Sequence, residues 1–144
     1  MIDRSNLSEY LSIIVITSPS PSNPCTNLIQ STIHSLQYIH HLEHCHIYII
    51  FDGYKVSSEN RTKKGKITKE SEVLYKMYID SLINIYSTST RYHFIECNEH
   101  YGFAHAVKLG LESCKTKYAI ISQHDRMFVS PFTSKFNNFM SIIQ

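Results

Sequence analysis

Four short apolar runs, separated by stretches of a different periodicity, constrain the fold of this chain more than any other feature. They span Leu11–Thr17, His46–Gly53, Tyr92–Asn98 and Tyr118–Gln123. The first run, LSIIVIT, is apolar and rich in β-branched residues, and the proline-rich SPSPSNP follows it. This pattern is typical of a strand buried on both faces of a sheet. We therefore predict four strands.

Apolar residues between these runs recur at the spacing of amphipathic helices. Asn23 is a candidate N-cap with Pro24 at the first helical position, which predicts a helix that ends near His41. Two more helices are expected, one through Leu74, Met77, Tyr78, Leu82 and Ile85, the other through Phe103, Ala106, Val107, Leu111 and Cys114. The order βαβαβαβ predicts an α/β fold with a mostly parallel sheet and right-handed crossovers.

Length and composition limit the class of protein. The 144 residues match one domain, and 42% apolar with 18% charged residues is ordinary for a globular chain. A net charge of +2 is too small to indicate nucleic-acid binding. The four cysteines form no C-x-x-C pair, which argues against thiol redox chemistry and a four-thiolate zinc site. No apolar run reaches the roughly 18 residues of a membrane span and no signal peptide is visible, so we expect a soluble cytoplasmic protein.

Two charged segments are harder to interpret. Residues 54–69 hold six of the fourteen Lys and Arg residues and show no hydrophobic period, which predicts an exposed basic loop. The run HHLEHCH at 40–46 places His40 and His44 four residues apart, a spacing that a zinc site can use. The run lies on the amino side of the predicted sheet, and histidine is favourable near a helix C-terminus in any case.

Two of the predicted strands end in an acidic residue, Asp52 and Asp125. In an open parallel α/β sheet, ligands bind in the crevice outside the carboxyl ends of the strands. A carboxylate in this position is costly to bury without a cation or hydrogen-bond donors nearby. We interpret both acids as candidate ligand-binding residues, and the alternative is that both are strand caps.

The succession LSIIVIT, IYIIFDG and ECNEHYGFAHAVKLGLESCKTKYAIISQHDRMF resembles the N-terminal, nucleotide-sugar-binding half of GT-A glycosyltransferases, in particular the family 2-like enzymes. The likeness covers most of residues 11–130 and implies a Rossmann-like three-layer sandwich with helices on both faces of the sheet. In that family the second strand ends in an acid that contacts the nucleoside, and Asp52 matches it. The fourth strand ends in a D-x-D motif that holds a divalent cation against the diphosphate. Here this motif reads Gln123-His124-Asp125.

The resemblance implies a set of site residues. The candidate nucleotide-sugar-binding residues are Thr17, Asp52, Gly53, His100, Gly102, Lys108 and Gln123, and the candidate metal ligands are Asp125 and His124. His100 and Lys108 replace the two asparagines of the family segment N-x-G-x-x-x-A-x-N-x-G-L. Because Gln123 supplies a neutral oxygen in place of a carboxylate, Mn2+ or Mg2+ should bind weakly unless the phosphates of the nucleotide contribute. The alternatives are that His124 packs inward and that Lys108 is an ordinary exposed lysine.

A glycosyltransferase of this kind transfers a sugar from a nucleotide-diphosphate sugar to a glycan, protein or lipid acceptor. Here the first acid of the metal motif is missing, and only residues 130–144, with a predicted helix around Phe136, follow it. We therefore expect a single, truncated or minimal domain over 1–144 without the acceptor-binding half. The alternative is a catalytically inactive nucleotide-sugar-binding or interaction module. Sugar-nucleotide pyrophosphorylases are disfavoured because SPSPSNPC contains no glycine.

Overall fold

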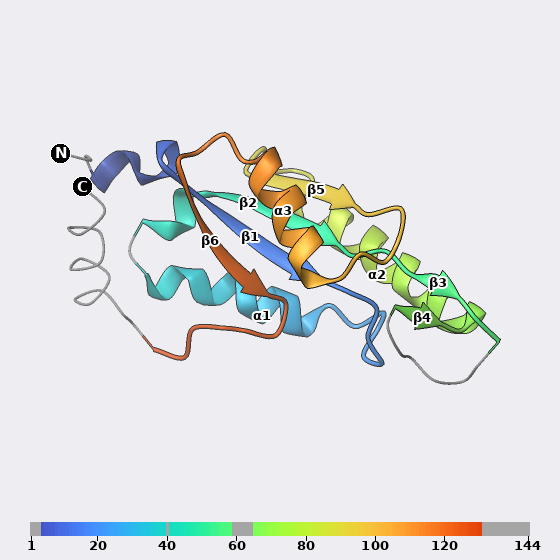
Figure 1. Cartoon of the computed structure of the whole chain (residues 1–144). Coiled ribbons are helices and arrows are strands. Elements are labelled where there is room, and N and C mark those ends of the chain that lie inside the picture. The colour runs from blue at the N-terminus through green and yellow to red at the C-terminus, as the bar shows by residue number, and fades with distance from the viewer. Residues whose placement is uncertain (1–3, 40, 59–64, 131–144) are drawn as a thin grey trace.

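The computed structural model describes residues 4–39, 41–58 and 65–130 of the chain. After a short 3-10 helix, η1 (Arg4–Glu9), the main sheet is built from β1 (Leu11–Thr17), β2 (His46–Phe51), β5 (Tyr92–Glu96) and β6 (Tyr118–Gln123). Its strand order is β5-β2-β1-β6, and all three pairings are parallel (Figure 1). The prediction of four strands in a parallel sheet is confirmed, and β1 and β6 have the predicted bounds.

Helices cover both faces of this sheet (Figure 1). Helices α1 (Asn27–Ser35) and α2 (Lys69–Tyr86) pack on one face, in a core that includes Ile13, Ile33 and Leu82. Helix α3 (Phe103–Ser113) packs on the other face, against Ile14 and Ile50. Successive side chains of a strand point to opposite faces, so odd-numbered residues of β1 meet one layer and even-numbered residues meet the other. The prediction of an α/β fold is confirmed, and the arrangement is compatible with a Rossmann-like fold.

The two central strands are the most deeply buried elements. All seven residues of β1 are buried, as are Ile47–Phe51 of β2. Helix α3 approaches β1 closely because Gly110 faces it: a Cβ atom at this position would lie 2.7 Å from Ile14 Cγ2. The continuous apolar pattern of the two strands is therefore explained by helical layers on both sides.

The strand order changes direction once. The chain builds β1, β2 and β5 in one direction across the sheet, and α3 then carries it back to β6 on the other side of β1 (Figure 1). The carboxyl ends of β1 and β6 therefore lie side by side where the order reverses. In open α/β sheets such a switch point opens a crevice in which ligands bind.

The first predicted helix was wrong at both ends. Asn23 does not cap it, because its Oδ1 atom accepts a hydrogen bond from the Ser20 amide (2.8 Å) and closes a turn in the preceding loop. The helix ends at Ser35 and is followed by two 3-10 helices, η2 (Leu36–Tyr38) and η3 (Leu42–His44), in place of one helix to His41. His41 has a left-handed φ of 74°, which a continuous α-helix does not contain.

Two further predictions need correction. The basic segment contains a short parallel ladder between β3 (Lys55–Val56) and β4 (Lys66–Ile67), where an unstructured loop was expected. The buried face of α2 consists of Tyr75, Tyr78, Ile79 and Leu82, whereas Met77 and Ile85, predicted to face inward, are 50% and 43% exposed. On α3, the predicted core residues Phe103 and Leu111 are likewise exposed.

Residues 59–64 of the basic segment and the predicted helix around Phe136 lie outside the described residues. Within the described ranges, none of the helices has the length and apolar character needed to cross a membrane.

Candidate functional site

A small cavity of about 170 Å3 lies at the crevice where the strand order reverses. It is lined by Ile16, Thr17, Ser18, Asp52, Phe103, Gln123, His124 and Asp125. These residues come from the carboxyl ends of β1, β2 and β6 and from the start of α3. Five of the nine candidate residues inferred from the sequence thus meet around one space. The carboxyl edge of the sheet is therefore the candidate site.

Asp52, directly after β2, is buried within a shell of hydrogen-bond donors. Its side chain is 4% exposed, and its Oδ1 atom accepts hydrogen bonds from the backbone amides of Gly53 (3.0 Å) and Tyr101 (3.4 Å). Its Oδ2 atom lies 3.0 Å from His100 Nδ1, in an ion pair when the imidazole is protonated, although this contact lacks hydrogen-bond geometry. The Tyr75 hydroxyl donates to the Asp52 carbonyl (3.1 Å). These donors offset the cost of burying the carboxylate.

Two glycines hold the surroundings of Asp52 in place. A Cβ atom at Gly53 would collide with the backbone carbonyl of Glu99, so the end of β2 and the loop before α3 touch through their backbones. Gly65 has a left-handed φ of 73°, and a side chain there would collide with the imidazole of His100. Gly53 and His100, candidate nucleotide contacts in the sequence, therefore lie in the shell that supports Asp52.

Thr17, at the end of β1, is anchored to α2. Its hydroxyl lies 3.0 Å from the Tyr78 hydroxyl in a buried hydrogen bond. Burial raises the pKa of Tyr78 to about 12, so this phenol stays protonated at neutral pH. Burial, and next the charge of Asp52, raise the pKa of the Cys97 thiol behind the site. Cys97 therefore lacks the low pKa of a reactive cysteine.

The end of β6 is held by its backbone and leaves its acid exposed. The His124 amide donates to the Ile16 carbonyl (3.0 Å), and the His124 carbonyl accepts from Thr32 Oγ1 (2.8 Å). Asp125 follows with a side chain that is 48% exposed and lies 3.8 Å from Arg126 Nε. The Asp125 oxygens consequently remain accessible to a ligand, in contrast to those of Asp52.

The possible metal ligands at this edge form a weak donor set. They are the exposed carboxylate of Asp125, the carboxamide of Gln123 and the imidazole of His124. Mg2+ requires six ligands, mostly oxygen, in near-octahedral geometry. Among the residues that the structure describes, no three His, Cys, Asp or Glu side chains are grouped to hold a metal ion. These residues therefore fit a cation only when a bound ligand supplies further oxygens.

Two of the four candidate residues outside the cavity lining also lie outside the shell that supports Asp52. Lys108 is exposed on α3, with its Nζ atom 3.6 Å from the Glu112 carboxylate one turn later. Gly102 precedes α3 with a φ of 83°, a conformation that favours glycine.

The histidine run at 40–46 contains an interaction that the sequence did not indicate. His40 lies outside the described residues, while His46 Nδ1 lies 2.9 Å from His93 Nε2 of β5. His93 also stacks on Tyr48, with ring centroids 4.4 Å apart. The two histidines are 47 positions apart in the chain, so only the register between β2 and β5 could have revealed their contact.

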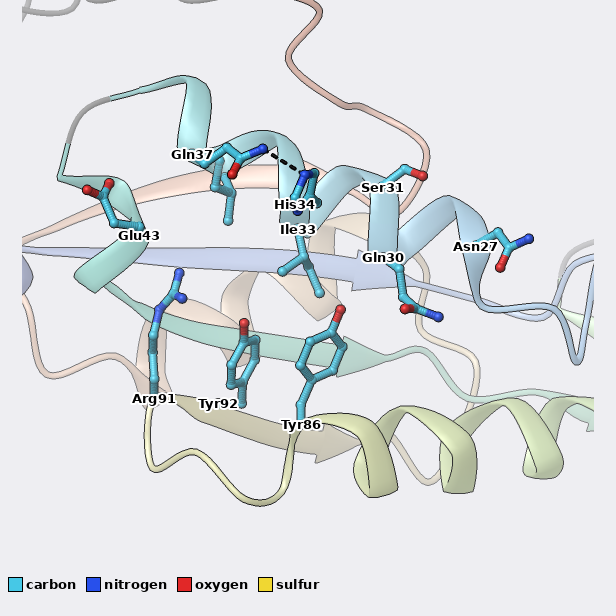
Figure 2. A pocket seen from close by; sticks show the side chains of 11 residues that line it. Asn27, Gln30, Ser31, Ile33, His34, Gln37, Glu43, Tyr86, Arg91 and Tyr92 are labelled. Carbon is cyan, nitrogen blue, oxygen red and sulfur yellow. Dashed lines mark hydrogen bonds between the residues drawn. The ribbon is translucent and has the colours of Figure 1, made fainter.

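A second, larger cavity of about 550 Å3 lies beside α1 and shares no lining residue with the crevice (Figure 2). In open α/β sheets ligands bind outside the carboxyl ends of the strands, and of these two cavities the smaller lies there. We therefore place the candidate site at the smaller cavity.

Comparison with models of known protein families and with curated proteins finds no match for this chain. The function must therefore be argued from the site itself.

Proposed function

We propose that the chain binds a nucleotide-diphosphate sugar at the carboxyl edge of its sheet and acts as a family 2-like glycosyltransferase. The observation that supports this most is the convergence of Thr17, Asp52, Gln123 and Asp125 around one cavity at the switch point between β1 and β6. Nucleotide ligands of doubly wound α/β folds bind at such switch points. The GT-A resemblance adds the sugar nucleotide and the divalent cation to this proposal.

The size of the cavity limits how such a ligand can lie. Its 170 Å3 is below the roughly 300 Å3 at which small-molecule pockets begin. One end of the ligand would enter the cavity, and the rest would extend over the open edge next to Asp125. A base or ribose that binds Asp52 would compete with His100 for Oδ2.

Asp125 and Gln123 are the residues that would hold Mn2+ or Mg2+ against the diphosphate. A bound cation would stabilise the negative charge that develops on the leaving diphosphate. One carboxylate and one carboxamide make a poor site alone, so metal and nucleotide are expected to bind cooperatively.

Calorimetric titration with UDP-, GDP- and dTDP-sugars, with and without Mn2+, tests this proposal. Asp125→Asn should abolish the increase in nucleotide affinity that Mn2+ causes and leave metal-free binding nearly unchanged. Gln123→Asp should strengthen metal binding, because it adds a second negative charge. Asp80→Asn on the exposed side of α2 is the matched control and should behave like the wild type. A full Mn2+ effect in Asp125→Asn would contradict the proposed role.

A second function is favoured by one observation, the carboxamide of Gln123 in place of the first acid of the metal motif. It is a catalytically inactive module that binds a sugar nucleotide without transferring the sugar. Release of free sugar from the bound donor distinguishes the two functions. Metal-dependent hydrolysis that Asp125→Asn removes supports the transferase, whereas binding without hydrolysis supports the module.

A further inference from the structure

The larger cavity opens between α1 and the junction of α2 with β5 (Figure 2). Its volume of about 550 Å3 falls within the range of small-molecule sites. The side chains that matter for its chemistry are Gln30, Gln37, Glu43, Tyr86, Arg91 and Tyr92. We call this cavity the helix-face groove. It is unrelated to the candidate nucleotide site, with which it has no residue in common.

Two tyrosines supply the floor of the helix-face groove. The rings of Tyr86 and Tyr92 stack with centroids 4.4 Å apart, and both hydroxyls point into the groove (Figure 2). Within the part of the chain that the structure describes, neither hydroxyl has a hydrogen-bond partner. Each can both donate and accept, so the pair presents two adjacent positions for a polar ligand.

Neutral amides form the opposite wall. Gln30 extends from α1 and donates through Nε2 to Thr26 Oγ1 (2.7 Å). At the rim, Gln37 Nε2 lies 2.7 Å from His34 Nε2 (Figure 2). These bonds use the amide nitrogens, and the carbonyl oxygens of both glutamines remain as acceptors. The wall is therefore polar without being charged.

The charged end of the groove is incompletely paired. Arg91 directs its guanidinium to backbone carbonyls, donating from Nε to Cys45 (2.6 Å) and from Nη2 to Leu42 (3.3 Å). Glu43, which also lines the groove, has a shielded Oε2 atom without a hydrogen-bond partner among the described residues, although the rest of its side chain is partly exposed. Because Oε2 is closed to solvent, a ligand reaches Glu43 only through the remainder of its side chain, which is 41% exposed.

We propose that the helix-face groove binds a saccharide, that is, a neutral ligand rich in hydroxyl groups. Hydroxyls donate and accept, as do the phenols on the floor, and they can donate to the amide oxygens and to Glu43. One cation and one anion, Arg91 and Glu43, leave no net charge that would select a phosphate or a carboxylate. The proposal does not depend on the proposed glycosyltransferase function, since no nucleotide is involved.

Two-dimensional NMR titration tests whether the helix-face groove binds a saccharide. The panel, used without nucleotide, contains glucose, galactose, mannose, N-acetylglucosamine, lactose and cellobiose. At least one of these sugars should shift the resonances of Gln30, Gln37 and Arg91. Tyr86→Phe and Tyr92→Phe each remove one hydroxyl and retain the stacked ring. Each should weaken that sugar's binding about tenfold, as expected for one lost hydrogen bond to a ligand.

Tyr38→Phe is the matched control, because Tyr38 is 38% exposed and does not line the groove. Its affinity for the sugar should equal that of the wild type, and thermal unfolding of every variant verifies the fold. The proposal is overturned if no sugar in the panel shifts the groove resonances, or if both Phe variants retain full affinity. Neither result affects the Asp125 titration, so the two proposals fail separately.

Discussion

Asp52 and Asp125 occupy similar places in the sequence, yet their surroundings differ. Asp52 follows β2 directly, and Asp125 follows β6 of the same parallel sheet with only His124 between them. Asp52 is 4% exposed, and two backbone amides and His100 lie within hydrogen-bonding or ion-pair distance of its oxygens. Asp125 is 48% exposed and has a single loose ion pair with Arg126. The Asp52 carboxylate is therefore buried among its hydrogen-bond donors, and the Asp125 carboxylate is accessible at the surface.

The position of the strand in the sheet explains the difference. Strand β2 lies between β1 and β5, so the loop from β5 to α3 passes over its carboxyl end and supplies the Tyr101 amide and His100. Among the described strands, β6 pairs with β1 only. The backbone after β6 bonds to α1 through Thr32 and Ser35, and the Asp125 side chain stays 48% exposed. An acid at the end of a central strand is therefore prone to become structural, whereas an acid at the end of an outer strand remains open to ligands.

The largest expected effect is on stability when Asp52 is removed. Asp52→Ala should lower the free energy of unfolding by about 3 kcal/mol, because it leaves the Gly53 and Tyr101 amides without their acceptor and removes the ion-pair partner of His100. Asp125→Ala should change it by no more than about 0.5 kcal/mol, as is usual for exposed positions. Urea denaturation of both variants measures the contrast.

Asp52→Asn refines this test, since it retains an oxygen for the two amides and loses only the charge near His100. Its loss of stability should lie between those of Asp52→Ala and the wild type. Equal stability of Asp52→Ala and Asp125→Ala would show that the donors around Asp52 contribute nothing.

The bounds of an element could be predicted from the sequence where one pattern, such as a continuous apolar run, determined them. The continuous apolar run of β1 gave its bounds, because burial on both faces leaves little room for polar residues. The bounds of β6, an outer strand without a buried residue, followed from its short apolar run and the polar residues at its end. The start of α1 was missed because the Asn23 side chain accepts a hydrogen bond from the Ser20 amide in the preceding turn. Asparagine is favoured both in such turns and as a helix N-cap, so its residue type alone does not distinguish the two positions. The core role of Tyr75 was missed because a tyrosine can be buried only where its hydroxyl finds a partner, here the Asp52 carbonyl.

The candidate site was predictable to a similar extent. The rule that ligands bind at the carboxyl edge brought Thr17, Asp52 and Gln123 together correctly around one cavity. It could not reveal that Gly65 lies against His100, because this contact depends on the β3–β4 ladder inside a segment without hydrophobic period. Contacts between distant loops follow from tertiary register, which local patterns do not encode.

The next largest expected effect is at Gly65, beside the β3–β4 ladder. It tests whether this ladder helps to hold the residues around Asp52 in place. Gly65→Ala should lower the free energy of unfolding by about 2 kcal/mol, because it combines left-handed backbone strain with a collision against His100. Gly102→Ala is the matched control, since it has a similar φ of 83° and no atom within 4 Å of the new Cβ. It should cost only about 1 kcal/mol of backbone strain. Equal losses in the two variants would show that His100 moves aside freely.

The smallest expected effect is the contribution of His93 to the pH dependence of stability. It must be known before acid denaturation is used to compare Asp52 with Asp125. At the opposite edge of the sheet, burial, then His46 and then Lys115 lower the pKa of His93 from its ordinary 6.5. The groups that face His93 are His46 and Tyr48 of β2 and Lys115 after α3, and none of them favours its protonated form. The native state thus prefers the neutral imidazole.

Because the unfolded chain protonates His93 first, the free energy of unfolding should be unaffected by His93 above about pH 6.5 and should fall as the pH drops below that value. His93→Gln should flatten this acid dependence, as measured by urea denaturation midpoints between about pH 7.5 and about pH 5. His44→Gln, which removes a side chain that is 69% exposed, should retain the wild-type slope. If His93→Gln keeps that slope as well, the acid sensitivity arises elsewhere, and the carboxyl edge with Asp52 becomes the place to look for it.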